Sequence, residues 1–282
     1  MDELCGGVRY SILDPTGNIT ALVESAVEVA MQPAIAASIM RRHPEVEQVG
    51  FVRLPVSQNA DNHLHGALRM AGGEFCGNAT MSAAALCALR AGVGERGIQL
   101  AVSMSVSGAK EPVGVLLRRE TDGSFAAGVH MPGALGVEPV ELAFGEMRGS
   151  LPLVRMEGIS HLIIEPSSPF FRLRERPEAA EQAVRQWCHT LSADGLGLMF
   201  LEEGPAARRM TPLVFVPGAD TVFWESSCAS GSSAVGMCLA SREGTPVGLS
   251  LAEPGGKLHV KSDPLRAETW LFGSVRLLEE CR

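Results

Sequence analysis

The stretch GGEFCGNATMSAAALCALRAG, residues 72–92, decides the fold of this chain. Cys76 stands in a turn rich in Gly and Asn, and this turn runs straight into small residues typical of a buried helix. The run from Asn78 to Thr80 offers side chains that cap a first helical turn, and Gly92 and Gly94 are of the type that ends a helix. We therefore predict a helix that starts beside Cys76.

A thiol at a helix start has a particular chemistry. The positive end of the helix dipole favours the thiolate form of Cys76. The amides of Gly77 and Asn78 lie in the first turn, where they can bind an anion. A single cysteine in such a place is also a common buried core residue. The stretch thus indicates a reactive cysteine beside a carboxylate pocket, with simple packing as the alternative.

A second copy of the pattern favours the reactive alternative. Residues 224–244 read WESSCASGSSAVGMCLASREG, again with a cysteine, Cys228, in a turn that opens a small-residue helix closed by Gly. Cys228 follows Cys76 by about half the chain, which predicts two related domains, 1–135 carrying Cys76 and 136–282 carrying Cys228, with a linker near 133–149. Cys87 and Cys238, each farther along its helix, are predicted to be core residues.

Composition narrows the function. The chain has 282 residues, 46% hydrophobic and 20% charged, which is typical of a globular protein. Its net charge of −8 and the lack of a Lys/Arg-rich run argue against nucleic acid or an anionic membrane as partner. No apolar run reaches transmembrane length, and we expect a cytoplasmic location. Seven cysteines without CxxC or Cys/His spacing predict reduced thiols and no metal site.

The remaining pattern predicts an α/β (α+β) fold of two pseudo-symmetric domains, each a curved mixed β-sheet wrapped around a central helix. Amphipathic helices are predicted over 33–42 and 177–191, both opened by Pro. Strands are predicted over 8–13, 19–23, 47–54, 65–70, 98–106, 112–118, 124–131, 197–201, 211–216, 247–251, 258–261 and 269–278, and one or two more within 153–165.

Two thiols facing each other across a cleft can invert a stereocentre. A base removes a proton from one face while an acid delivers one to the other, and a thiolate and a thiol supply this pair. The helix-start amides of Gly77, Asn78, Ala229 and Ser230 can hold the charge that spreads into the substrate carboxylate. Such a reaction needs no cofactor, and no lysine is placed to form a Schiff base.

The residues that carry this chemistry resemble a known family. DPTGN (14–18), EQVG (47–50), FCGN (75–78), GISH (158–161) and SCASG (227–231) stand in the order of the cofactor-independent diaminopimelate epimerase superfamily, over nearly the whole chain. Within it, GGEFCGNATMS and WESSCASGS are most similar to the histidine racemase branch of opine-metallophore (staphylopine-type) biosynthesis.

The resemblance implies a catalytic thiol pair, Cys76 and Cys228, a small amino acid substrate and a homodimer. It also implies that Asn18, Gln48, His161 and Glu225 line the substrate cleft beside the helix-start amides. Each of these four residues has a structural alternative, respectively a turn residue, a strand-edge residue, a core histidine and a solvated carboxylate.

Departures from the superfamily bear on the substrate. Diaminopimelate epimerases carry Asn-Ala-Asp-Gly-Ser-Glu before the first cysteine and Glu-Arg-Gly before the second, where this chain has MAGGE (70–74) and DTVFW (220–224). Phe223 and Trp224 offer aromatic surface that suits an imidazole ring, or else belong to the core. We therefore expect a histidine racemase. Diaminopimelate epimerase, another amino acid racemase, a non-catalytic binding protein and a thiol redox protein are the alternatives.

Overall fold

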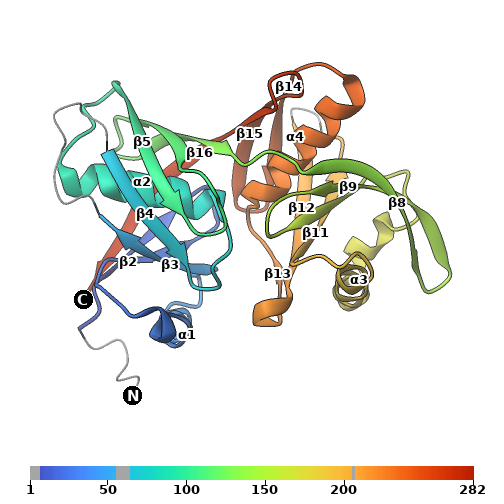
Figure 1. Cartoon of the computed structure of the whole chain (residues 1–282), viewed down its shortest axis with the longest axis horizontal. Helices are drawn as coiled ribbons and strands as arrows, with labels where there is room; N and C mark the ends of the chain where they lie inside the picture. Colours follow the sequence, from blue (N-terminus) through green and yellow to red (C-terminus); the bar gives the residue numbers. More distant parts are fainter. Residues whose placement is uncertain (1–6, 55–63, 205–206) are drawn as a thin grey trace. The chain divides into compact units, whose positions relative to one another are not determined.

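The computed structural model describes residues 7–54, 64–204 and 207–282. The chain forms two compact units. The first comprises Met1–His130 and Phe272–Arg282, and the second comprises Met131–Leu271. The fold is mixed α/β and dominated by strands (Figure 1). The predicted division into domains 1–135 and 136–282 stays a proposal. It differs from the two compact units in the last segment, Phe272–Arg282, which belongs to the first unit.

The strands of the first unit form a ring of neighbours. In pairing order they are β1 (Tyr10–Asp14), β2 (Thr20–Val23), β3 (Gln48–Arg53), β4 (Leu64–Met70), β5 (Gln99–Val106), β6 (Val113–Arg119) and β7 (Phe125–Met131). The long strand β16 (Glu268–Cys281) lies next to β7 and also pairs antiparallel with β1. The ring encloses α2 (Gly77–Ala91), whose residues are buried from Gly77 to Ala88 (Figure 1).

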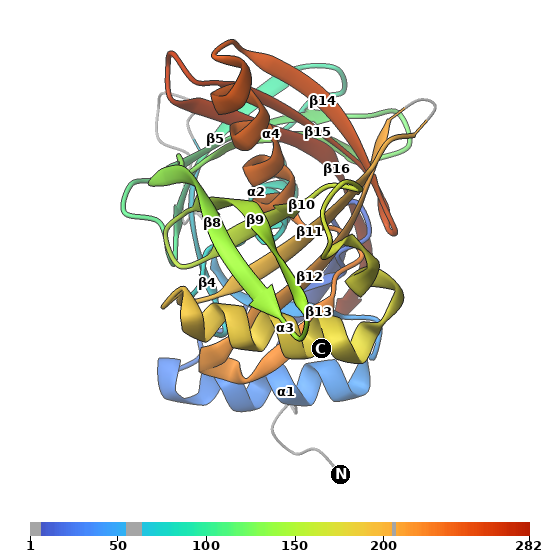
Figure 2. The same ribbon diagram turned by 90° about the vertical axis from the view of Figure 1, so that its right-hand side faces the viewer.

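The second unit repeats this series of pairings. Its strands are β8 (Gly136–Phe144), β9 (Met147–Arg155), β10 (Ser160–Ile164), β11 (Leu196–Glu202), β12 (Arg208–Val216), β13 (Thr221–Trp224), β14 (Val247–Glu253) and β15 (Gly256–Asp263). The series antiparallel, parallel, antiparallel, parallel, antiparallel runs through β1 to β6, and again through β9, β10, β11, β12, β14 and β15. The contacts of α4 (Ala229–Glu243) are with β8 to β11, β14 and β15 (Figure 2).

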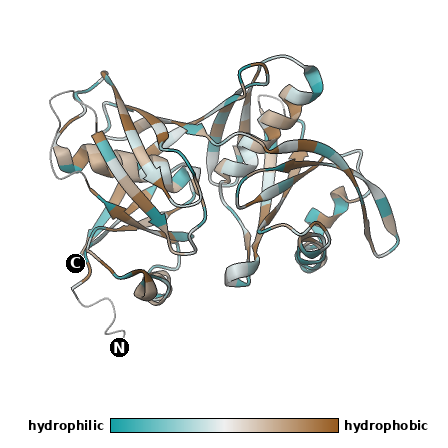
Figure 3. Cartoon of the chain, viewed as in Figure 1, coloured by the Kyte–Doolittle hydropathy of each residue, from teal (hydrophilic) through white to brown (hydrophobic). Residues whose placement is uncertain are grey.

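A second, amphipathic helix covers the outside of each sheet. In the first unit α1 (Gln32–Arg42) packs on β3 and buries Ile35 and Ile39. In the second unit α3 (Pro177–Thr190) packs on β11 and β12 and buries Trp187 at the centre of its core. Hydrophilic residues colour much of the outer surface of α3, whereas α2 is largely apolar (Figure 3). α3 starts at Pro177 and α1 starts one residue before Pro33, so both predicted helices are confirmed.

The predicted linker over 133–149 is wrong. Gly136–Phe144 is strand β8, which forms an antiparallel hairpin with β9 around Gly145. The stretch looked irregular because Glu138, Pro139 and Glu141 break the apolar pattern. These residue types are typical of an exposed edge strand, where they hinder pairing with other chains, and β8 ends the strand order.

Candidate active site

The first predicted catalytic residue caps its own helix. Cys76 has extended backbone angles (φ −135°, ψ 116°) and is the N-cap of α2, with its Sγ accepting the amide hydrogen of Ala79 at 3.4 Å. The cap was expected from Asn78 to Thr80, which is wrong. The Thr80 hydroxyl instead donates to the Cys76 carbonyl at 2.7 Å, and Asn78 turns towards β2. The Cys76 side chain is half-buried and is not part of a disulfide.

A polar cluster stands beside this helix start. The Asn78 side-chain amide donates to Asn18 Oδ1 at 3.3 Å, and the Gln48 amide donates to the same oxygen and to Thr20 Oγ1 (2.9 Å). The Asn18 amide donates to Glu47 Oε2 at 2.6 Å. The structure thus joins three residues that the sequence assigned to the site, Asn18, Gln48 and Asn78. It adds Glu47, which precedes Gln48 in the sequence and was not predicted as a site residue.

The second predicted catalytic residue sits in the same local geometry. Cys228 is the N-cap of α4 (φ −122°, ψ 103°), and its Sγ accepts the amide hydrogen of Gly231 at 3.3 Å. The Ser230 hydroxyl lies 3.6 Å from this sulfur. Cys228 is only 4% exposed, and Ala229 after it is buried as well. Each unit therefore starts its central fifteen-residue helix on a cysteine whose sulfur receives a first-turn N–H.

Two carboxyl groups flank the second thiol. Glu225 hydrogen-bonds to the Cys228 side chain, and Glu253 at the end of β14 accepts the Cys228 amide hydrogen at 2.7 Å. Burial raises the pKa of Cys228 well above its ordinary value, and the negative charges of Glu225 and Glu253 raise it further. The Gly231 hydrogen bond lowers the pKa of Cys228, but desolvation and the two acidic neighbours outweigh it.

His161 lies beneath the start of α4, on β10. Its side chain is fully buried, and neither ring nitrogen has a hydrogen-bond partner among the residues that the structure describes. Its Nδ1 crowds the Cα of Gly197 on β11, where a Cβ would also approach Met199 Cε at 2.7 Å, and that same methionine packs against Gly231. Burial lowers the pKa of His161 to about 3, so the ring is neutral at physiological pH.

The two aromatic residues before Glu225 divide between core and surface. Trp224 stacks on Phe200 with ring centroids 6.1 Å apart, and its indole N–H donates to Glu181 Oε1 at 3.1 Å. Phe223 is 40% exposed. The structural alternative therefore holds for Trp224, while Phe223 keeps an exposed ring.

Other features of the chain lie apart from the two cysteines. Cys87 and Cys238 are buried, which confirms their prediction as core residues; Cys5 lies outside the described residues. Within the described ranges, no cluster of three His, Cys, Asp or Glu side chains is arranged to hold a metal, and no helix is long and apolar enough to cross a membrane.

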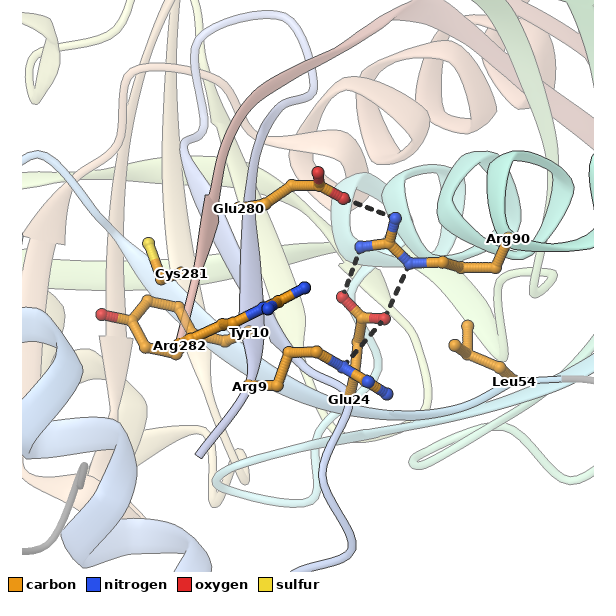
Figure 4. Close-up of a pocket in the computed structure, with 8 residues that line it drawn as sticks. All are labelled: Arg9, Tyr10, Glu24, Leu54, Arg90, Glu280, Cys281 and Arg282. Carbon is orange, nitrogen blue, oxygen red and sulfur yellow. Dashed lines mark hydrogen bonds and ion pairs between the residues drawn. The ribbon is translucent and has the colours of Figure 1, made fainter. Parts of the chain in front are cut away.

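One pocket of the first unit, of about 320 Å³, lies at the far end of α2 from Cys76. It is lined by charged residues, and the Arg90 guanidinium bridges Glu24 and Glu280 there (Figure 4). Because Arg90 pairs with both Glu24 and Glu280, this pocket connects α2 with the end of β2 and with β16.

The fold of this chain is similar to that of solved structures. A solved structure described as a "probable proline racemase" from Agrobacterium radiobacter K84 has a TM-score of 0.69 to this chain at 10% identity, covering 98% of this chain and 92% of that one. This chain and that structure therefore share one fold over nearly their whole lengths.

Sequence comparison then gives the family. A model described as "Histidine racemase CntK N-terminal domain" matches residues 7–270, and the chain belongs to this histidine racemase family. A histidine racemase of Fusobacterium nucleatum is 30% identical over 99% of this chain and 98% of its own length. Another, of Staphylococcus aureus, is 30% identical over 90% of this chain and 88% of its own length. The chain is an isomerase, an amino acid racemase.

Proposed function

We propose that this enzyme interconverts L- and D-histidine without a cofactor, using Cys76 and Cys228 as a two-base pair. The observation that carries the proposal is the repeated helix start, in which a cysteine sulfur receives a first-turn N–H in each unit. In a racemisation, the residue that acts as base from L to D acts as acid from D to L. Two cysteines with the same local geometry suit this exchange of roles. The histidine racemases similar to this chain support the substrate.

The proton balance of the reaction is simple. One cysteine acts as thiolate, takes the α-proton and becomes a thiol, while the other gives its proton to the opposite face of the α-carbon and becomes a thiolate. Between these transfers the electron pair spreads into the substrate carboxylate, where the first-turn amides of Gly77 and Asn78 can stabilise it from one side. The amides of Ala229 and Ser230 have the same role on the other.

The proposal requires the two units to form the pseudo-symmetric arrangement of diaminopimelate epimerases, with both thiols at one cleft. In that arrangement Asn18 and Gln48 help to bind the amino acid, and Glu225 binds its ammonium group or holds the Cys228 proton. His161, being buried and neutral, supports the cleft from beneath. A homodimer, a cytoplasmic location and use of D-histidine for an opine metallophore complete the proposal.

Phe223 favours histidine over diaminopimelate. Its exposed ring stands three residues before Ser226 and offers a stacking surface for imidazole. Diaminopimelate carries a second amino acid head group, which would call for an arginine there. Another amino acid racemase remains the nearest alternative, and a non-catalytic amino acid binding protein would have no use for two thiols at matching helix starts.

Proton NMR of the reduced enzyme in D2O tests the proposal. With L-histidine we expect the α-proton signal to disappear and D-histidine to form, whereas diaminopimelate in a parallel sample keeps its α-protons. Cys76→Ser and Cys228→Ser should each abolish racemisation, and Cys281→Ser, which changes another half-buried thiol of the chain, should not. Full activity in either serine variant of the pair would refute the two-base mechanism.

A further inference from the structure

A buried acid holds the second cysteine in place. Glu253 is 7% exposed, and its Oε2 accepts the Cys228 amide hydrogen at 2.7 Å while its Oε1 accepts the Ser232 hydroxyl at 2.5 Å. We propose that Glu253 is a positioning residue that makes the two cysteines inequivalent, keeping Cys228 in its thiol form so that Cys76 is the base of the resting enzyme. This inference rests on the proposed function.

The backbone around Glu253 fixes this contact. Glu253 pairs with Gly256 across the turn between β14 and β15, and within that turn the Gly255 amide donates to the Ser226 carbonyl at 2.7 Å. On the other side, the Glu225 amide donates to the Pro212 carbonyl at 3.1 Å. The segment before α4 is therefore held between β12 and the turn that follows β14, which keeps the Cys228 amide within reach of the Glu253 carboxyl group.

The electrostatics favour a protonated thiol. Two acids, Glu225 and Glu253, face Cys228, and His161 beneath it is neutral. The basic residues of β15 lie on the other face of the sheet, since they alternate with the buried residues that face α4; they are Lys257, His259 and Lys261. Burial raises the pKa of Glu253 to about 8, so the pair Glu253 and Cys228 resists taking on negative charge.

The first cysteine has a neutral group in the comparable place. There Ser107, directly after β5, accepts the Met70 amide hydrogen at 2.9 Å and donates its hydroxyl to the Glu74 carbonyl at 2.8 Å, two residues before Cys76. A hydroxyl anchors the chain but adds no charge when a nearby thiol ionises. The two helix starts thus share their geometry and differ in the group that anchors them.

Inequivalent thiols have a kinetic signature. Two enantiomers have equal free energy, so kcat/KM must be the same in both directions. When the state with Cys76 as thiolate and Cys228 as thiol dominates, the resting enzyme binds the enantiomer that presents its α-proton to Cys76. The other enantiomer binds only the rarer state, in which the two cysteines have the opposite protonation. Its KM and kcat are then both raised. We expect unequal KM values for L- and D-histidine.

Glu253→Gln tests the inference, because glutamine keeps an acceptor for the Cys228 amide and removes the charge. The titration of Cys228 is read from ultraviolet thiolate absorbance as the difference between each enzyme and its Cys228→Ser form. We expect this titration to move to lower pH and, above about pH 8 where Glu253 is ionised, the ratio of the two KM values to move towards 1. The matched control is Glu165→Gln, which changes an acid paired with Arg242 near the opposite end of α4 and should alter neither.

A second variant tests the same inference if Glu253→Gln folds poorly. Ser232→Ala removes the hydrogen bond that lowers the pKa of Glu253, so the carboxyl group stays neutral to higher pH and Cys228 again titrates earlier. If both variants fold and leave the titration and the KM ratio at wild-type values, the inference is overturned. If Cys228→Ser itself racemises histidine at full rate, the proposed function fails instead, whatever Glu253 does.

Discussion

Replacing Arg90 by leucine should show how strongly one buried ion pair holds the first unit together. The Glu24 side chain is 0% exposed, and Arg90 donates to its two oxygens through Nε and Nη2, both at 2.8 Å (Figure 4). These bonds connect α2 with β2, and a further ion pair, 2.5 Å from Arg90 to Glu280, connects α2 with β16. Leucine keeps much of the arginine stem but leaves the Glu24 carboxylate with weaker partners.

The expected loss in free energy of unfolding depends on the partners that Glu24 keeps when Arg90 is replaced. Removing one partner of a buried pair costs about 3–5 kcal/mol in general. Here Arg90 is 31% exposed, the Ser11 hydroxyl still donates to Glu24 at 2.7 Å, and Arg9 stays 3.8 Å away. We therefore expect Arg90→Leu to lower the free energy of unfolding by about 2–3 kcal/mol at neutral pH. In a unit of this size that corresponds to roughly 5–10 °C in Tm.

Urea unfolding followed by circular dichroism measures this loss. Arg118→Leu is the control, because Arg118 pairs with Glu120 where both side chains are exposed, and we expect it to cost less than about 0.5 kcal/mol. A loss for Arg90→Leu no larger than that of the control would refute the argument that burial makes the Glu24 pair important.

The pH dependence of the same variant has a definite sign. Burial raises the pKa of Glu24, but the bonds from Arg90 and Ser11 outweigh it and leave the pKa below its ordinary value of 4.5. The ion pair therefore stabilises the fold above about pH 4.5 and loses its effect as the pH falls through the folded-state pKa. The difference between wild type and Arg90→Leu should narrow below that pH, since Glu24 can then become neutral. A constant difference would contradict the ionic explanation.

Three further predictions concern the second unit. Gly231→Ala should lower racemase activity, because the new Cβ would meet Met199 and lie 3.0 Å from Cys228 Sγ, whereas Gly248→Ala has open space and should be neutral in a rate assay. The raised pKa of Glu253 means that its contribution to stability is complete below about pH 4.5 and is lost as the pH rises through about 8; Glu253→Gln should flatten this part of the stability curve in denaturant titrations. The lowered pKa of His161 means that its contribution is present above about pH 6.5 and is lost towards pH 3, so His161→Leu should reduce the acid sensitivity of Tm.

Local sequence patterns predicted much of this molecule. The four helices lie where the residues indicate, because helix starts and ends depend on a few neighbouring residues. Two of them follow Cys76 and Cys228 and end at glycine, and the other two, α1 and α3, carry a proline in the first turn. The cap residue itself was missed. Cysteine is an unusual N-cap, and only the structure shows its sulfur taking the amide that Asn78 or Thr80 was expected to satisfy.

Contacts between distant segments were harder to predict. Glu253 lies 25 positions after Cys228 and reaches it through the placement of β14 and the turn that follows, so nothing in the local sequence indicates the contact. The helix dipole favours a thiolate at each helix start, but at Cys228 burial and Glu225 raise the pKa of the thiol, and neither effect is visible in the local sequence. Trp224 looked like a possible substrate surface because its partner Phe200 is far away in the sequence.

The strand β16 sets the order in which the chain can fold during synthesis. The second unit is continuous from Met131 to Leu271 and has all its residues once these have left the ribosome. The first unit must wait, because Tyr10 at the beginning of β1 pairs with Cys281 at the end of β16. Until then β1 and β7 keep open edges that other nascent chains could pair with. We therefore expect the C-terminal unit of this racemase to complete its fold before the N-terminal one, the reverse of the usual order along a ribosome-bound chain.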